Sequence, residues 1–169
     1  EICNNSGTVN DFNSEEGVLY AEIAALADYN DNVARTISIM NSTSTIDLVR
    51  IYYYNNLIVG NLKVAGSNVV SFTYTPPIIT DLIKVALKYK QNDFAFWVNG
   101  VEIGSDLVGD TPIGLDTLVF NYSNINNFYG KTKNLKVFKR ALTDAELYLL
   151  TVTQYQSYQE MATALNYTL

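Results

Sequence analysis

The chain has 169 residues, of which 48% are hydrophobic and 17% are charged, and its formal net charge is −6. This length suits one domain with one core, and the hydrophobic share excludes a disordered chain. The net negative charge argues against nucleic-acid binding, which needs clustered Lys and Arg side chains. The lysines at 131–140 do cluster, but strand alternation explains them without a phosphate-binding surface. No run of about 18 apolar residues occurs, so no membrane span is predicted.

Alternating hydrophobic residues predict about ten strands, which turn residues separate at short intervals. The composition agrees, since the thirteen tyrosines favour strands and the abundant asparagine favours turns. This pattern is typical of an all-β sandwich or jelly roll. The predicted strands are residues 17–26, 34–40, 46–54, 57–64, 70–74, 83–89, 94–98, 101–104, 117–122 and 133–140.

A hairpin with a two-residue turn at Asn99 and Gly100 is the clearest of these signals, because a type I′ turn needs positive φ at both positions. Such a turn places Phe96 opposite Ile103 and leaves Trp97 on the other face. Two interpretations of an outward Trp97 are open. It stacks on a sugar ring, or it is covered, either by the terminal helices or by a neighbouring subunit. The residues expected on the core face are Phe94, Phe96, Val98, Val101 and Ile103.

Three consecutive tyrosines, Tyr52, Tyr53 and Tyr54, fall within one predicted strand. Neighbouring side chains of a strand point to opposite faces, so the three cannot all face the core. At least one of them must therefore meet solvent, a ligand or a partner.

The composition changes after Arg140. Thr143 and Glu146 form a capping box, which predicts a short helix over residues 144–151. A similar box at 157–160 predicts a second short helix near the C-terminus. We therefore divide the chain into a jelly-roll β-sandwich, residues 1–141, and a short helical tail, residues 142–169, docked on the sandwich or on a partner.

Three segments together resemble the concanavalin A-like lectin and laminin G-like jelly-roll superfamily. They are the hairpin Phe94 to Gly104, the loop Phe128-Tyr129-Gly130-Lys131, and a closing strand that runs into the helix, Leu135 to Leu147. The resemblance covers roughly residues 15–150 and implies an antiparallel jelly-roll β-sandwich with short C-terminal helices. Within the superfamily, the chain is most similar to modules of bacteriophage tail, fibre and other virion proteins.

This resemblance implies a non-enzymatic structural or adhesive module of a phage virion protein, such as a tail fibre, head fibre or decoration protein. Its expected place is the extracellular virion surface, and its expected partners are a host-surface glycan or other virion proteins. Because Glu1 is not a methionine, we expect the chain to be part of a longer protein. A virion role of this kind also leads us to expect a homo-oligomer in the full-length protein. The alternative is a secreted carbohydrate-binding module appended to an enzyme or adhesin.

Ligands in this superfamily usually meet loops at the rim of the sandwich. The candidate ligand-binding residues are therefore Trp97, Asn126, Asn127, Phe128 and Tyr129.

Catalytic residues are not apparent in the sequence. It contains no histidine, and its single cysteine, Cys3, lies near the terminus, which argues against nucleophilic triads and transition-metal sites. A glycoside hydrolase needs two facing carboxylates, and the nearest approach is Glu102 with Asp106, which a strand end at Gly104 separates. We expect no enzyme activity; the hydrolase alternative depends on Glu102.

Calcium is the one plausible cofactor, because its ligands are oxygen atoms and the chain has several loops rich in Asp and Asn. Asp28, Asn30 and Asp31 form the densest set, and Asp106 with Asp110 form a second. The competing interpretation, which we favour, is that these side chains cap turns.

Overall fold

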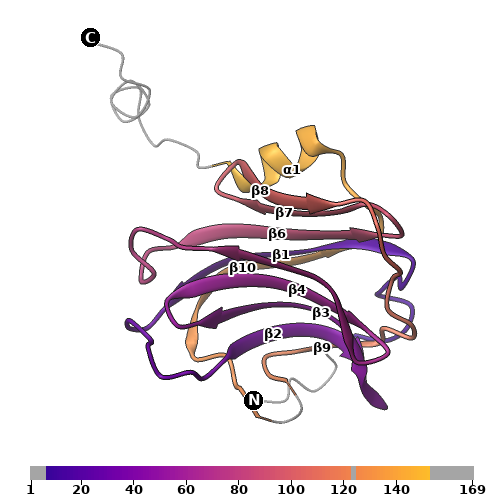
Figure 1. Ribbon diagram of the computed structural model, residues 1–169, viewed down its shortest axis with the longest axis horizontal. Helices are drawn as coiled ribbons and strands as arrows, with labels where there is room; N and C mark the ends of the chain where they lie inside the picture. Colours follow the sequence, from indigo (N-terminus) through magenta and orange to yellow (C-terminus); the bar gives the residue numbers. More distant parts are fainter. Residues whose placement is uncertain (1–6, 123–124, 153–169) are drawn as a thin grey trace.

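The computed structural model describes residues 7–122 and 125–152 of the chain. Two five-stranded sheets pack against each other as a sandwich, and a short helix, α1, lies on the far side of one of them (Figure 1). All strand pairs within the two sheets are antiparallel. The structure confirms the predicted all-β sandwich.

The chain crosses between the sheets four times, which brings residues far apart in sequence into one layer. Sheet A has the order β10 (Gly130–Phe138), β1 (Glu16–Ala25), β6 (Ile83–Lys90), β7 (Phe94–Val98) and β8 (Val101–Asp106). Sheet B has the order β5 (Ser67–Tyr74), β4 (Leu57–Val64), β3 (Ser44–Tyr54), β2 (Arg35–Asn41) and β9 (Thr117–Val119).

The core fills the space between the sheets with alternate side chains of the central strands, such as Leu19 of β1, Ile51 of β3 and Phe96 of β7. Gly60 of β4 lets the two sheets approach closely, because a Cβ at this position would lie 2.6 Å from the Phe96 ring. The alternation read from the sequence therefore identifies the inward faces of these strands.

The turn of the β7–β8 hairpin has the conformation that its sequence predicts. Asn99 and Gly100 have φ of 47° and 82°, and Val98 pairs with Val101. A type I′ turn requires this pair of positive φ values.

The strand register of the hairpin differs from the prediction beyond the pair of Trp97 and Glu102. A shift between Phe96 and Trp97 pairs Phe96 with Gly104 instead of Ile103. Ile103 still packs against the core, but Val101 is 58% exposed, so its predicted core position is wrong. The register shift is a β-bulge, in which two residues of one strand oppose one of its partner. Val101 lies before the bulge and keeps its predicted pairing with Val98, but it stands at the start of the edge strand β8.

Helix α1 spans Asp144–Thr151 and begins at the predicted capping box, in which Thr143 and Glu146 bond each other's backbone amides. It packs on the outer face of sheet A, where Leu147 meets Trp97 in a second hydrophobic cluster. The first predicted helix is thereby confirmed, and the second lies outside the described residues. Among the described residues, no helix has the length and apolar character that a membrane span needs.

Candidate functional site

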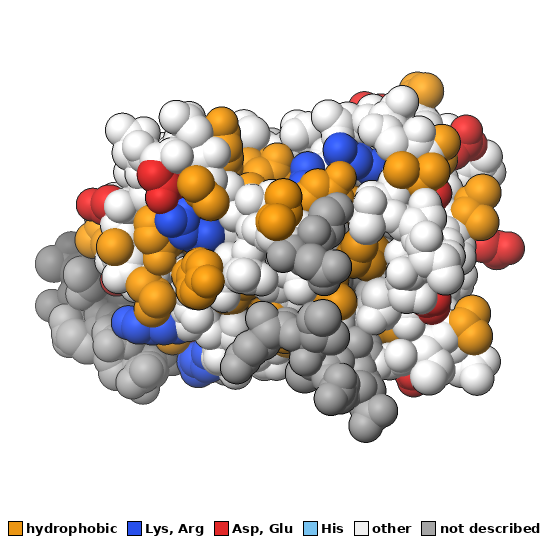
Figure 2. Space-filling view, turned by 90° about the horizontal axis from the view of Figure 1, so that it is seen from below, with side chains coloured by type: hydrophobic (Ala, Val, Ile, Leu, Met, Phe, Trp, Pro, Cys, Tyr) orange, Lys and Arg blue, Asp and Glu red, His pale blue; other side chains and the backbone are white. Residues whose placement is uncertain are grey.

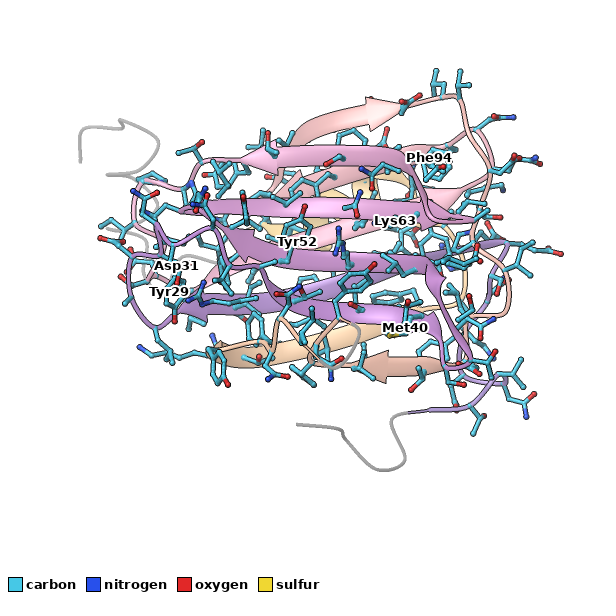
Figure 3. The ribbon with its side chains drawn as sticks, turned by 60° about the horizontal axis from the view of Figure 1, so that its bottom comes forward. Tyr29, Asp31, Met40, Tyr52, Lys63 and Phe94 are labelled. Carbon is cyan, nitrogen blue, oxygen red and sulfur yellow. The ribbon has the colours of Figure 1, made fainter. Side chains whose placement is uncertain are left out.

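The outer face of sheet B carries a group of polar and aromatic side chains. The tyrosine run explains its origin, because Tyr53 is fully buried between the sheets, so Tyr52 points outward with Arg50 two residues before it. Lys63 of β4 projects from the same face (Figure 3). We define the Arg50 face as Arg50, Tyr52, Asn61, Lys63 and Tyr122.

Arg50 is held in place by three neighbours. Its Nε donates a hydrogen bond to Asn61 Oδ1 at 2.8 Å. The guanidinium carbon lies 4.5 Å from the ring centroid of Tyr52 and 4.8 Å from that of Tyr122. Cation–π contacts of this kind orient a guanidinium without neutralising its charge.

Asn61 supports this arrangement from below. It is 1% exposed, and its Nδ2 donates to the carbonyl oxygen of Val70 at 2.8 Å and to Asn68 Oδ1 at 3.1 Å. With both ends of its amide bonded, Asn61 has one orientation that satisfies its partners. It therefore positions Arg50 through its oxygen.

The charge of Arg50 is not balanced by a carboxylate. Among residues 7–122 and 125–152, no ion pair joins Arg50 or Lys63 to Asp or Glu. The five strands of sheet B contain a single acidic residue, Asp47, whose Oδ1 accepts from the backbone amides of Ala65 and Ile113. The face is thus locally cationic in an acidic protein.

Burial favours the neutral forms of two ionisable side chains on this face, Arg50 and Tyr52. It lowers the pKa of the Arg50 guanidinium and raises the pKa of the Tyr52 hydroxyl, because both charged forms lose solvent. Arginine still remains protonated in proteins. Figure 2 views the molecule from this side and shows basic side chains beside hydrophobic ones, with acidic side chains toward the ends.

The predicted rim loops meet at one end of the sandwich. The Tyr29 hydroxyl donates to the carbonyl oxygen of Tyr129 at 3.1 Å, which joins the 28–31 loop to the 126–129 segment. The Arg35 guanidinium carbon lies 3.4 Å from the Tyr29 ring centroid, and Asp31 pairs with Arg35 (Tyr29 and Asp31 are labelled in Figure 3). The structure therefore brings together two groups that the sequence treats separately.

Most of the predicted ligand contacts have structural roles here. Asn126 accepts from the backbone amide of Thr36 through its carbonyl, and Asn127 forms a bridge with Thr36. Phe128 packs against the core with its ring 5.8 Å from that of Tyr53.

Trp97 is 8% exposed because α1 covers it, whereas Tyr129 is 59% exposed. The expectation that terminal helical structure covers Trp97 agrees with this placement. Of the predicted ligand contacts, Tyr129 is therefore the one that is largely exposed to solvent.

Asp31, one of the three predicted calcium ligands, pairs with a cationic side chain of the protein itself. Both carboxylate oxygens of Asp31 accept from Arg35, at 3.0 and 2.6 Å, and this hydrogen bonding lowers the pKa of Asp31 to about 2. Asp31 also caps its own turn by accepting from the Val33 amide. Within the described residues, no three His, Cys, Asp or Glu side chains gather as a metal group. Calcium binding by Asp28 and Asn30 stays a prediction.

A cavity of about 620 Å³ lies away from the Arg50 face, where β1 begins and β6 ends. Glu15, Glu16 and Asp110 line it with a single cationic side chain, that of Lys90. Lys90 pairs with Glu16 at 3.4 Å, and Asp110 accepts from Gln91. Glu16 and Asp110 therefore have partners, and the lining as a whole is acidic, so we place the candidate site on the Arg50 face instead.

The sequence analysis did not predict four residues of the Arg50 face as candidate site residues. They are Arg50, Asn61, Lys63 and Tyr122. Strand alternation contains the necessary signal for Arg50, since it shares a face with Tyr52. The pairing of Arg50 with Asn61 and the return of Tyr122 to this face depend on tertiary structure.

Known proteins share the fold but not the sequence. No family model matches the chain, and no curated protein matches it. A carbohydrate-binding module, the CBM40 of the Ruminococcus gnavus IT-sialidase, has a similar structure, with a TM-score of 0.66 and 16% identity over 83% of this chain and 84% of that chain. That module has also been solved bound to α2,3- and α2,6-sialyllactose.

Two longer sialidase chains also contain a similar domain. The leech intramolecular trans-sialidase matches with a TM-score of 0.65 and 20% identity over 86% of this chain and 24% of that chain. The NanB sialidase of Streptococcus pneumoniae matches with a TM-score of 0.64 and 17% identity over 89% of this chain and 27% of that chain. At such identities, the likeness establishes the jelly-roll, lectin-like β-sandwich fold.

Proposed function

We propose that this chain is a non-enzymatic carbohydrate-binding module that binds an acidic glycan on the Arg50 face. The observation that carries the proposal is the Arg50 guanidinium, which is fixed by Asn61, flanked by Tyr52 and Tyr122, and not paired with a carboxylate among the described residues. A guanidinium presents parallel N–H donors that match a carboxylate in two hydrogen bonds. Sialic acid is a sugar that carries such a carboxylate.

The tyrosines of the face suit the rest of a sugar. An aromatic ring offers an apolar surface, and the phenol adds a hydroxyl that donates or accepts hydrogen bonds. Tyr52 and Tyr122 are both partly buried, and Tyr122 is anchored by two backbone hydrogen bonds with Ile125. A rigid surface of this kind loses little conformational entropy on binding.

The solved structures support the secreted-module alternative over the virion role. The three similar structures described above come from sialidases, and one of them was also solved with sialyllactose bound. Glycosidic cleavage needs paired carboxylates, which the Arg50 face does not contain. On β8, Asp106 caps the next turn by accepting from Val108, which argues against a catalytic pair with Glu102. Phage virion attachment, virion-surface location and homo-oligomerisation stay predictions.

Isothermal titration calorimetry with α2,3-sialyllactose and with neutral lactose tests the proposal. We expect binding of the sialylated sugar alone, and we expect R50Q to weaken it at least about tenfold, because a charge-assisted pair is lost. R50K keeps the charge without the two-pronged geometry and should be intermediate.

The matched control is K136Q, which removes an exposed cation 5.8 Å from the Tyr20 ring on sheet A. It should leave the affinity unchanged, and circular dichroism melting should show that every variant is folded. Equal affinities of R50Q and the wild type, or equal binding of lactose and sialyllactose, would overturn the proposal.

A further inference from the structure

Lys63 gives the Arg50 face a second positive charge that the proposed function does not use. We infer that the face prefers glycans with two anionic groups, one bound by Arg50 and the other by Lys63. This inference rests on the proposed function and adds to it a class of ligand, a sialylated glycan with a further carboxylate or a sulfate ester.

The sheet register separates the two cations. Arg50 pairs with Asn61, and Leu48 pairs with Lys63, so Lys63 is the diagonal neighbour of Arg50. Diagonal positions on adjacent strands lie about 7–8 Å apart at the backbone. One carboxylate held in two hydrogen bonds by Arg50 would therefore leave the Lys63 ammonium to bind another group.

Both cations also lie at one aromatic ring. The distance to the Tyr122 ring centroid is 4.8 Å from the Arg50 guanidinium carbon and 5.6 Å from Lys63 Nζ. The two charges are thus within about 10 Å of each other, close to the screening length of physiological salt. They repel each other in the free protein, and anions at both positions would relieve that repulsion.

The two side chains differ in how firmly they are held. Arg50 is bonded to the buried Asn61, whereas no hydrogen bond or ion pair holds Lys63 Nζ among residues 7–122 and 125–152. A lysine on a flexible stem binds a carboxylate or a sulfate as a point charge. The second position should therefore select for charge more than for the geometry of the anionic group.

Calorimetry with three ligands at fixed salt tests this inference. The ligands are α2,3-sialyllactose, disialyllactose and sialyllactose with a sulfate ester. We expect the wild type to bind at least one doubly charged ligand about fivefold more tightly than sialyllactose. K63Q should weaken binding of the doubly charged ligands more than binding of sialyllactose and so remove this preference, whereas K136Q should keep the preference.

The possible failures are distinct. If the wild type binds sialyllactose but binds neither doubly charged ligand more tightly, the second anion position does not exist and the proposed function stands. If K63Q weakens all three ligands equally, Lys63 shares one carboxylate with Arg50, which also overturns the inference. If no sialylated ligand binds, both the proposed function and the inference fail. If the wild type prefers one doubly charged ligand over the other, that preference shows whether the Lys63 position favours a carboxylate or a sulfate ester.

Discussion

The outer faces of the two sheets have opposite characters. On sheet A, Trp97 is 8% exposed beneath α1, beside the small residues Ala86 and Ala95. On sheet B, Arg50 and Lys63 remain partly exposed and have no carboxylate partner among the described residues. Small residues let a helix approach a sheet, whereas unpaired cations favour an anion. The aromatic residue most typical of a sugar site thus serves packing here, while the candidate site lies on the opposite sheet.

Removing the contact between α1 and sheet A should have the largest effect on stability. Leu147 is fully buried against Trp97, so L147A should lower the free energy of unfolding by about 2–5 kcal/mol. Urea denaturation measures this change. L149A is the matched control, because Leu149 is 69% exposed on the same helix, and it should change stability by less than about 0.5 kcal/mol. Similar losses for both variants would show that α1 is not docked through Leu147.

The start of α1 offers a smaller test of the covered face. T143A removes the side-chain oxygen that accepts from the Glu146 amide, and it should cost about 1 kcal/mol. T143S keeps the oxygen and should stay close to the wild type. Thermal melting of the pair measures the effect, and both variants should bind sialyllactose as the wild type does. A loss of glycan binding in folded T143A would mean that the two faces are not independent.

The acid sensitivity of α1 gives the smallest expected effect. Hydrogen bonding to Arg140 lowers the pKa of Glu146 to about 2, below its value of about 4.3 in an unfolded chain. A lowered pKa stabilises the folded state above the unfolded value, and this contribution is lost as the pH falls through about 4 toward 2.

Denaturation midpoints at several pH values test this effect. They should fall less steeply for E146Q than for the wild type between about pH 4 and 2. The matched control is E15Q, which should show the same pH dependence of the midpoint as the wild type. Glu15 is exposed, and its carboxylate has no hydrogen bond or ion pair within the described residues. An unchanged slope in E146Q would contradict a role for this pair in stability.

Local patterns predicted most of the fold because each depends on neighbouring residues. The bounds of Leu57–Val64 and of α1 agree with the prediction, since a turn or a capping box marks them. The bulge in β8 was missed, and so was the close approach of Gly104, next to the bulge, to the Phe72 ring of the other sheet. A pattern within one strand contains no information about such a contact.

The candidate site was less predictable for a related reason. The Arg50 face combines residues of β3, β4 and the segment after β9, and its character depends on which charges have partners. The sequence shows the cations but not which of them have carboxylate partners: Asp31 pairs with Arg35, whereas Arg50 has no such partner among the described residues. Resemblance directed attention to the rim loops, where Phe128 proves to pack against the core.

Chemical-shift mapping by NMR tests most directly that the Arg50 face, and not the Trp97 face, binds glycan. The isotope-labelled protein is titrated with α2,3-sialyllactose, and the single tryptophan gives one indole N–H signal as an internal reporter of the covered face. We predict shifts of the Arg50 side-chain signal and of backbone amides in β3 and β4, while the Trp97 indole signal stays in place. A shift of the Trp97 signal with unchanged Arg50 signals would contradict the account.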